Sequence, residues 1–263
     1  MHLTARKTQD KTSSVNTADT KIKWAAKLDH VREVSVLGTA DLAYWKARLR
    51  KEDLVPVERD GRAQILIIAA DMKFGGVRFR ELSFSVLVSG QACGIQQEAS
   101  YLIRAFSSSR LFAFCERAFF STPYLHGDVR LPTSLPASIQ LLEAGESVFH
   151  LAMQADSSVS SREPLRSGDE GLEGAVFLPK RRGGSGRDGK LFFARIQGHT
   201  RTYPFLPAKD SLTIRPSSGS DVPQMLIDSQ LVAKEWAIRA DASHAKSRTY
   251  KRAGDLSGLR VER

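Results

Sequence analysis

The sequence predicts a mainly β protein of α+β character, in which a curved antiparallel sheet closes into a barrel with a few helices. Short runs of alternating or continuous apolar residues, bounded by turn residues, recur along most of the 263-residue chain and are typical of strands. Only two segments have convincing helical spacing, so the strands do not alternate with helices as in an α/β fold. An antiparallel barrel or a strongly curved sheet is therefore expected.

The chain is expected to fold as one domain with a tail at each end. Its length and its 41% of hydrophobic residues suffice for one full core. We interpret residues 1–33 as a polar N-terminal tail and lead-in, 34–250 as the barrel domain, and 251–263 as a basic C-terminal tail. Residues 1–20 have no hydrophobic period, which predicts a disordered or loosely packed segment.

The net charge of +10 is concentrated in residues 1–33, 180–190 and 246–263. Solvated tails and a Gly-rich loop hold such charge without a partner, and no nucleic-acid reader motif accompanies it. No specific nucleic-acid partner is therefore expected. A nucleic-acid-associated protein that uses its basic tails is kept as a third hypothesis.

Composition also predicts a soluble, cytoplasmic protein. No segment approaches the roughly 18 uncharged apolar residues of a membrane span, and the N-terminus lacks the apolar run of a secretory signal. Cys93 and Cys115 have no paired Cys/His spacing that would indicate zinc, so buried thiols in a reducing compartment are expected. Neither a metal nor a cofactor is predicted.

The first elements are a helix and two strands. Thr39 is expected to cap the helix, in which Leu42, Trp45 and Leu49 recur at helical spacing. Residues 63–89 then read as a continuous apolar strand and an alternating strand, joined by a glycine-containing turn.

The alternating strand has two different faces. The apolar face is expected to be core and consists of Leu82, Phe84, Val86 and Val88. The polar face consists of Glu81, Ser83 and Ser85. That polar face is either solvated or lines the lumen of a closed barrel.

The second helix is the clearest in the chain. A serine cluster able to cap it precedes apolar residues at helical spacing, which are Leu111, Phe114, Cys115, Ala118 and Phe119. The helix is expected to end near Thr122, because Pro123 disfavours the helical conformation in the residue before it. Residues 124–131 should then leave as a strand that Gly127 interrupts.

Most of the remaining chain is predicted to be strand. The expected strands are 137–144, 147–155, 174–179, 190–200 and 232–240, with a polar loop over 156–171. The stretch 236–250 includes Arg239, Asp241, His244 and Lys246 and is interpreted as a solvated tail rather than a site.

Tyr124, His126 and Asp128 stand at alternate positions after Pro123. If strand pairing is regular from Tyr124, the three side chains point to one side and can converge on a pocket, although a bulge at Gly127 would move Asp128. His126 is the first candidate for acid/base work because imidazole titrates near neutrality. The alternative is a histidine that only satisfies a turn.

The stretch "GVRFRELSFSV", followed about forty residues on by "CERAFFSTPYLHGDVRL", resembles the acetoacetate decarboxylase-like superfamily over roughly residues 75–131. That family has a strand with a Gly…Tyr…Glu-Leu pattern before a helix that ends in Gly-Phe-Pro-Lys-Lys. Glu81 matches its glutamate and Pro123 the proline before its lysine pair. The resemblance implies a cone-shaped antiparallel barrel whose lumen holds the active site, and it favours a homo-oligomer.

The two lysine positions of the family are occupied by Tyr124 and Leu125. In the true decarboxylases the first lysine forms a Schiff base with a keto acid, and the second lowers its pKa. Neither Tyr124 nor Leu125 can form an imine, so decarboxylation of acetoacetate by the family mechanism is not expected.

The leading hypothesis is therefore a barrel protein that binds a small, anionic organic acid. As an enzyme it would be a lyase or hydrolase that acts on this acid without a catalytic lysine. Its catalytic candidates are Glu81, His126 and Tyr124, and its substrate-binding candidates are Arg104, Arg117 and Asp128. The arginines would hold a carboxylate. The second hypothesis is a ligand-binding or regulatory barrel without catalysis.

Overall fold

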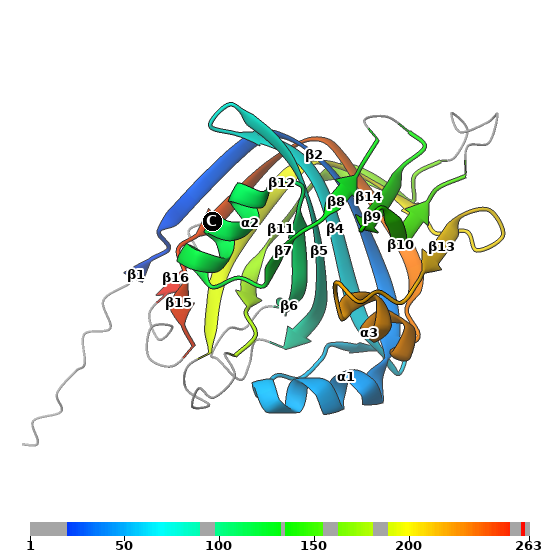
Figure 1. Cartoon of the computed structure of the whole chain (residues 1–263), viewed down its shortest axis with the longest axis horizontal. Coiled ribbons are helices and arrows are strands. Elements are labelled where there is room, and N and C mark those ends of the chain that lie inside the picture. Colours follow the sequence, from blue (N-terminus) through cyan, green and yellow to red (C-terminus); the bar gives the residue numbers. More distant parts are fainter. Residues whose placement is uncertain are drawn as a thin grey trace, which may run out of the picture.

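The computed structural model describes residues 20–89, 98–132, 135–154, 163–180, 189–252 and 259–260. Seven long strands form a closed ring, in the order β11-β12-β14-β2-β4-β5-β6, because β6 also pairs with β11 (Figure 1). These strands are β2 (Trp24–Asp41), β4 (Arg62–Phe74), β5 (Val77–Ser89), β6 (Glu98–Ser107), β11 (Arg166–Phe177), β12 (Lys190–Pro204) and β14 (Val232–Ser247). The predicted mainly β barrel is confirmed.

The ring is antiparallel except where it closes. There β11 and β6 run parallel, and only Val176 with Ser100 and Phe177 with Tyr101 are paired. Three short strands extend the ring, namely β3 (Glu58–Arg59) on β4, β7 (Tyr124–His126) on β6 and β15 (Tyr250–Lys251) on β12.

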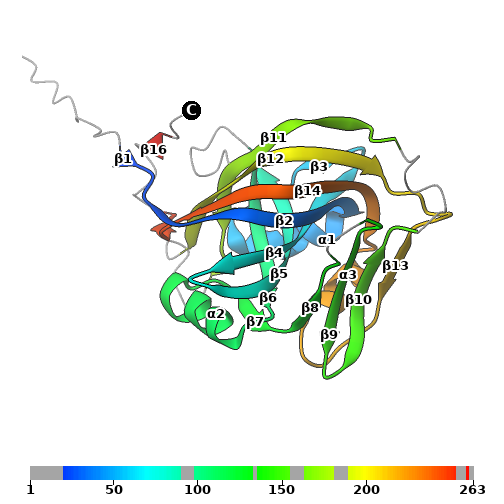
Figure 2. The same ribbon diagram turned by 90° about the horizontal axis from the view of Figure 1, so that it is seen from above.

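A smaller sheet lies beside the ring (Figure 2), in the order β13-β10-β9-β8. Its strands are β8 (Asp128–Arg130), β9 (Ser138–Glu143), β10 (Glu146–Ala152) and β13 (Ser211–Ile214). A separate parallel pair joins β1 (Thr20–Lys21) to β16 (Leu259–Arg260).

The described residues contain three α-helices, α1 (Leu42–Leu49), α2 (Arg110–Cys115) and α3 (Val222–Asp228). The 3₁₀ turn η1 (Arg50–Glu52) extends α1, and the π-helical turn η3 (Glu116–Phe120) extends α2. Helix α3 was not anticipated from the sequence. Helices α1 and α2 lie toward opposite ends of the ring (Figure 1). Among the described residues, no helix is both long and apolar enough to cross a membrane.

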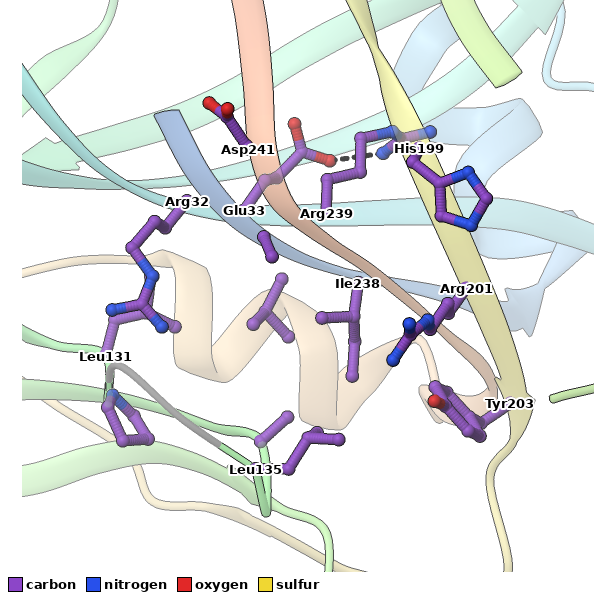
Figure 3. Close-up of a pocket in the computed structure, with 14 residues that line it drawn as sticks. Arg32, Glu33, Leu131, Leu135, His199, Arg201, Tyr203, Ile238, Arg239 and Asp241 are labelled. Carbon is purple, nitrogen blue, oxygen red and sulfur yellow. Dashed lines mark hydrogen bonds and ion pairs between the residues drawn. The ribbon is translucent and has the colours of Figure 1, made fainter. Parts of the chain in front are cut away.

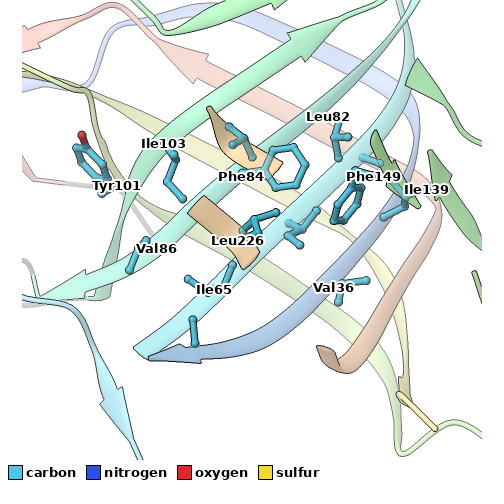
Figure 4. Packing of buried hydrophobic residues seen from close by; sticks show 14 of the residues in the cluster. Val36, Ile65, Leu82, Phe84, Val86, Tyr101, Ile103, Ile139, Phe149 and Leu226 are labelled. Carbon is cyan, nitrogen blue, oxygen red and sulfur yellow. The ribbon is translucent and has the colours of Figure 1, made fainter. Parts of the chain in front are cut away.

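The main hydrophobic core lies outside the ring, between its outer wall and the smaller sheet with α3 (Figure 4). The apolar face of β5 points into it, where the ring of Phe84 meets that of Phe149 from β10 edge-on, with 5.0 Å between centroids. Since successive side chains of a strand alternate between faces, the polar face with Glu81 must point into the lumen. Of the two alternatives for that face, the lumen is the one observed.

Gly127 is the residue at which the chain passes from the ring to the smaller sheet, between β7 and β8. A Cβ atom there would lie 2.9 Å from Leu141 Cδ1 and 3.1 Å from Phe106 Cδ1. Only glycine avoids this crowding. The predicted interruption of the strand is confirmed, and it separates Asp128 from β7.

Several local predictions were wrong. The helix cap is Asp41, whose side chain accepts a hydrogen bond from Tyr44 N at 2.6 Å, whereas Thr39 pairs with Gln64 within the sheet. Strand β2 begins at Trp24, inside the segment interpreted as the lead-in. Strand β11 begins at Arg166, inside the predicted polar loop.

The apolar stripe of the second helix is not buried. The exposed fractions of Leu111, Phe114 and Phe119 are 66%, 56% and 73%. The helix is held instead by Phe112, whose ring stacks on that of Phe79 with 4.1 Å between centroids. Residues 1–19 and 181–188, which include most of the predicted tail and basic loop, lie outside the described residues.

Candidate functional site

A cavity of about 400 Å³ occupies the end of the ring lumen beneath α2 and η3. All seven ring strands contribute to its wall. Most of this wall is apolar, and its ionisable side chains include Glu81 from β5, Glu116 from η3, Tyr124 from β7, and His244 and Lys246 from β14. Within the described residues, no group of three or more His, Cys, Asp or Glu side chains is arranged to hold a metal ion.

Glu81 and Tyr124 form a hydrogen-bonded pair on this wall. Tyr124 Oη donates to Glu81 Oε2 at 2.9 Å. Burial raises the pKa of Glu81 to about 7, the charge of Glu116 adds to this rise, and Tyr124 and Lys246 oppose it. Burial and the charges of Glu81 and Glu116 raise the pKa of Tyr124 well above its usual value. Tyr124 therefore stays a donor, while Glu81 exchanges its proton near neutral pH.

Lys246 supplies a fixed positive charge beside this pair. Its ammonium forms an ion pair with Glu116 and lies 4.6 Å from the ring centroid of Phe120 and 4.7 Å from that of Phe192. Thr122 Oγ1 donates to Glu116 Oε2 at 2.7 Å, which fixes the carboxylate. The exposed fraction of each side chain of the Lys246–Glu116 pair is 18%, so the pair lies in the wall without being sealed from the cavity.

A second buried network, centred on Glu33, holds the His244 side chain in place. Glu33 accepts from Arg239 Nη1 at 2.5 Å, lies 2.7 Å from His244 Nε2, and accepts from the hydroxyl of Ser35. Burial alone would raise the pKa of Glu33, but the hydrogen bonds and charges of His244 and Arg239, with the Ser35 bond, lower it overall. Glu33 is therefore a carboxylate, and it favours the His244 tautomer that carries its proton on Nε2.

The structure brings two of the three predicted catalytic residues together, Glu81 and Tyr124. His126 is exposed and does not line the cavity. Strand β7 ends there, opposite Ser107, the last residue of β6. Tyr124 and His126 therefore do not converge on one pocket.

None of the three predicted substrate-binding residues lines the lumen cavity. Arg104 is paired in the sheet with the outward-facing Phe84, and its guanidinium binds Asp221 at 2.7 Å. Arg117 is exposed on η3. Asp128 belongs to the smaller sheet, where Arg130 lies 3.0 Å away.

Sequence reasoning missed Lys246, His244 and Arg239. Their segment, interpreted as a solvated tail, is the second half of β14. Regular alternation would not have found them, because Glu235, Ala237 and Arg239 face the lumen at odd positions whereas His244 and Lys246 face it at even positions. The pairing of β14 with β2 shifts register between Arg239 and His244. On a strand that lines a lumen, polar residues at alternate positions face inward rather than toward solvent.

A separate pocket of about 310 Å³ lies on the outer wall of the ring (Figure 3). The guanidinium groups of Arg32 and Arg201 flank Ile238, and Leu135 lies opposite. The Glu33–Arg239 ion pair forms its back wall. This pair therefore stands between the outer pocket and the lumen.

The fold and the cavity together define a class of protein: closed barrels that hold polar side chains in a small lumen site covered by a short helix. Solved structures similar to the chain include acetoacetate decarboxylases and a related enzyme. An acetoacetate decarboxylase structure is 13% identical, covers 86% of this chain and 88% of its own, and has a TM-score of 0.59. The acetoacetate decarboxylase of Legionella pneumophila subsp. pneumophila str. Philadelphia 1 is 14% identical, covers 97% and 100%, and also has a TM-score of 0.59.

The enduracididine biosynthesis enzyme MppR, complexed with the condensation product of pyruvate and imidazole 4-carboxaldehyde, is 12% identical over 92% of this chain and 93% of its own, with a TM-score of 0.57. Neither a protein-family sequence model nor a curated protein sequence matches the chain. The chain has the acetoacetate decarboxylase-like fold, as the resemblance from residues 75–131 implies.

Proposed function

We propose that the protein binds a small organic acid in the lumen cavity and performs acid/base chemistry on it, with Glu81 as the proton carrier and no covalent lysine intermediate. The observation that carries this proposal is the Glu81–Tyr124 hydrogen bond at the cavity wall beside the Lys246 ammonium. A carboxylic acid, a phenol and a cation are the groups needed to bind an anion and to move a proton on it.

The charges suggest how such an acid would lie. Its carboxylate faces Lys246, whose ammonium lies 5.8 Å from the ring centroid of Tyr124, and its neighbouring oxygen or carbon faces Glu81. With a pKa of about 7, Glu81 is present in both forms at neutral pH, and it can donate or accept a proton. A further solved structure of MppR is a complex with pyruvate, and it supports a small carboxylate such as pyruvate as the ligand.

Isothermal titration calorimetry with pyruvate and with acetoacetate tests the proposal. The wild-type protein is expected to bind at least one of them, and Tyr124→Phe to weaken that binding about tenfold, the effect of one lost hydrogen bond. Glu81→Gln should keep binding but lose any turnover, followed by NMR of the acid. His126→Ala is the matched control and should behave as wild type, and equal affinities in all variants would refute the proposal.

Reduction with borohydride in the presence of acetoacetate is expected to leave the mass of the protein unchanged. Tyr124 and Leu125 occupy the family's lysine positions, and the ammonium of Lys246 is engaged in an ion pair with Glu116. Intact-mass spectrometry measures this. A stoichiometric adduct that disappears in Lys246→Arg would contradict the lysine-independent chemistry.

A further inference from the structure

The lumen contains a second chamber of about 330 Å³, toward the end of the ring that carries α1. All seven ring strands contribute to its wall as well, so it is interior space of the same barrel. Six residues line both this second chamber and the lumen cavity: Leu66, Ile68, Ser100, Val176, Ala194 and Ile196. The two spaces are therefore adjacent, and these six shared residues form an almost wholly apolar waist between them.

The far end of the second chamber is polar again. Thr202 and Arg239 line it, and the Arg166–Glu235 ion pair, with 2.7 Å between Nη2 and Oε1, stands at its mouth. Within the described part of the chain, Arg239 Nε is buried and has no hydrogen-bond partner. A buried donor without an acceptor is unfavourable, so an acceptor oxygen placed here would be bound strongly.

The register of the strands gives the distance from Glu81 to the far side of the waist. Glu81 lies opposite Ala70 on β4, and the lumen face of β4 continues through Ile68 to Leu66 at the waist. Four residues of strand span about 13 Å, so a ligand reaching from Glu81 past the waist is considerably longer than pyruvate.

We propose that the barrel binds an elongated organic acid with oxygen functions at both ends. The head of this acid lies at Glu81, Tyr124 and Lys246, and its methylene chain crosses the waist. Its distal oxygens contact Arg239 and Thr202. The position of the head rests on the proposed function. The apolar waist and the unpaired Arg239 donor are independent of it.

Calorimetric titration of the full chain with two series of acids tests this. One series is hexanoate, octanoate and decanoate, and the other is the dicarboxylates of equal length, adipate, suberate and sebacate. Affinity is expected to rise about fourfold for each methylene group buried at the waist. A dicarboxylate long enough to reach the far end is expected to bind at least tenfold more tightly than the monocarboxylate of equal length.

Three variants locate the effect. Leu37→Trp fills the second chamber without altering the wall of the lumen cavity, because Leu37 lines only the second chamber. It is expected to abolish the gain from chains that extend past the waist while leaving pyruvate binding intact. Thr202→Val removes one distal hydroxyl at nearly constant volume and should reduce only the preference for dicarboxylates. Ile238→Trp, which fills the outer pocket instead, is the control and should leave both series unchanged.

The outcomes separate the two proposals. Binding of pyruvate without any gain from chain length or from the second carboxylate would overturn this inference and leave the proposed function standing. A gain from chains longer than the waist that survives in Leu37→Trp would also overturn it. Failure of the short and the long acids alike to bind would refute the proposed function as well.

Discussion

Replacing Lys246 by methionine is expected to lower the affinity for a small organic acid by about tenfold to a hundredfold, because the fixed cation beside Tyr124 and Glu81 is lost. The substitution also leaves Glu116 without its counter-charge in a largely buried wall, at a cost to the free energy of unfolding of about 2 kcal/mol, between the values for exposed and buried pairs. Calorimetry and urea denaturation measure the two effects.

The double variant Lys246→Met/Glu116→Gln separates these effects. Removing the unpaired carboxylate should restore most of the stability, whereas ligand affinity should stay low because the cation is still absent. If the double variant regains affinity, Lys246 acts only by neutralising Glu116, and the ligand's carboxylate binds elsewhere.

The second large effect concerns the pH dependence of stability. Because the pKa of Glu81 rises from an ordinary 4.5 to about 7 on folding, the folded protein holds a proton between these pH values that the unfolded chain releases. The contribution of Glu81 to stability is complete below pH 4.5 and is lost as the pH rises through about 7. The loss amounts to about 3 kcal/mol at most.

Glu81→Gln has no charge to bury, so its free energy of unfolding should not fall between about pH 5 and 8, and at pH 8 it should exceed that of wild type. Below pH 4.5 the two proteins should lose stability together. Burial opposes ionisation of Asp71, but Arg78 and Arg80 lower its pKa overall, and its stabilising charge is lost in acid in both proteins. Denaturation series at fixed pH measure this, and parallel curves over the whole range would contradict it.

Local pattern was enough for the β4–β5 hairpin and for the two faces of β5, because both depend on neighbours in sequence. It could not decide whether Glu81 met solvent or a lumen, since a polar face suits both surroundings. That choice depends on ring closure between β6 and β11, whose pairs lie far apart in the chain.

The candidate site was predicted only in part, even within the stretch that the resemblance covers. Glu81 and Tyr124 meet as expected, but His126 does not join them, because Gly127 directs the chain to the second sheet at once. Lys246 comes from a strand whose polar positions looked like a tail. The apolar stripe of the second helix pointed to a buried helix face, yet Phe114 and Phe119 are exposed and Phe112 makes the packing contact instead.

The closure of the ring by two residue pairs has a consequence for how the protein folds. Strands β6 and β11 can meet only after the chain between them has been looped out, and β12 and β14 must join before the circle is complete. Such long loops make closure an entropically costly and late event. Glu81 and Lys246 come from opposite arms of that circle, so an intermediate with an open ring has no binding site. A ligand therefore stabilises only the closed form, and it should slow unfolding without accelerating refolding.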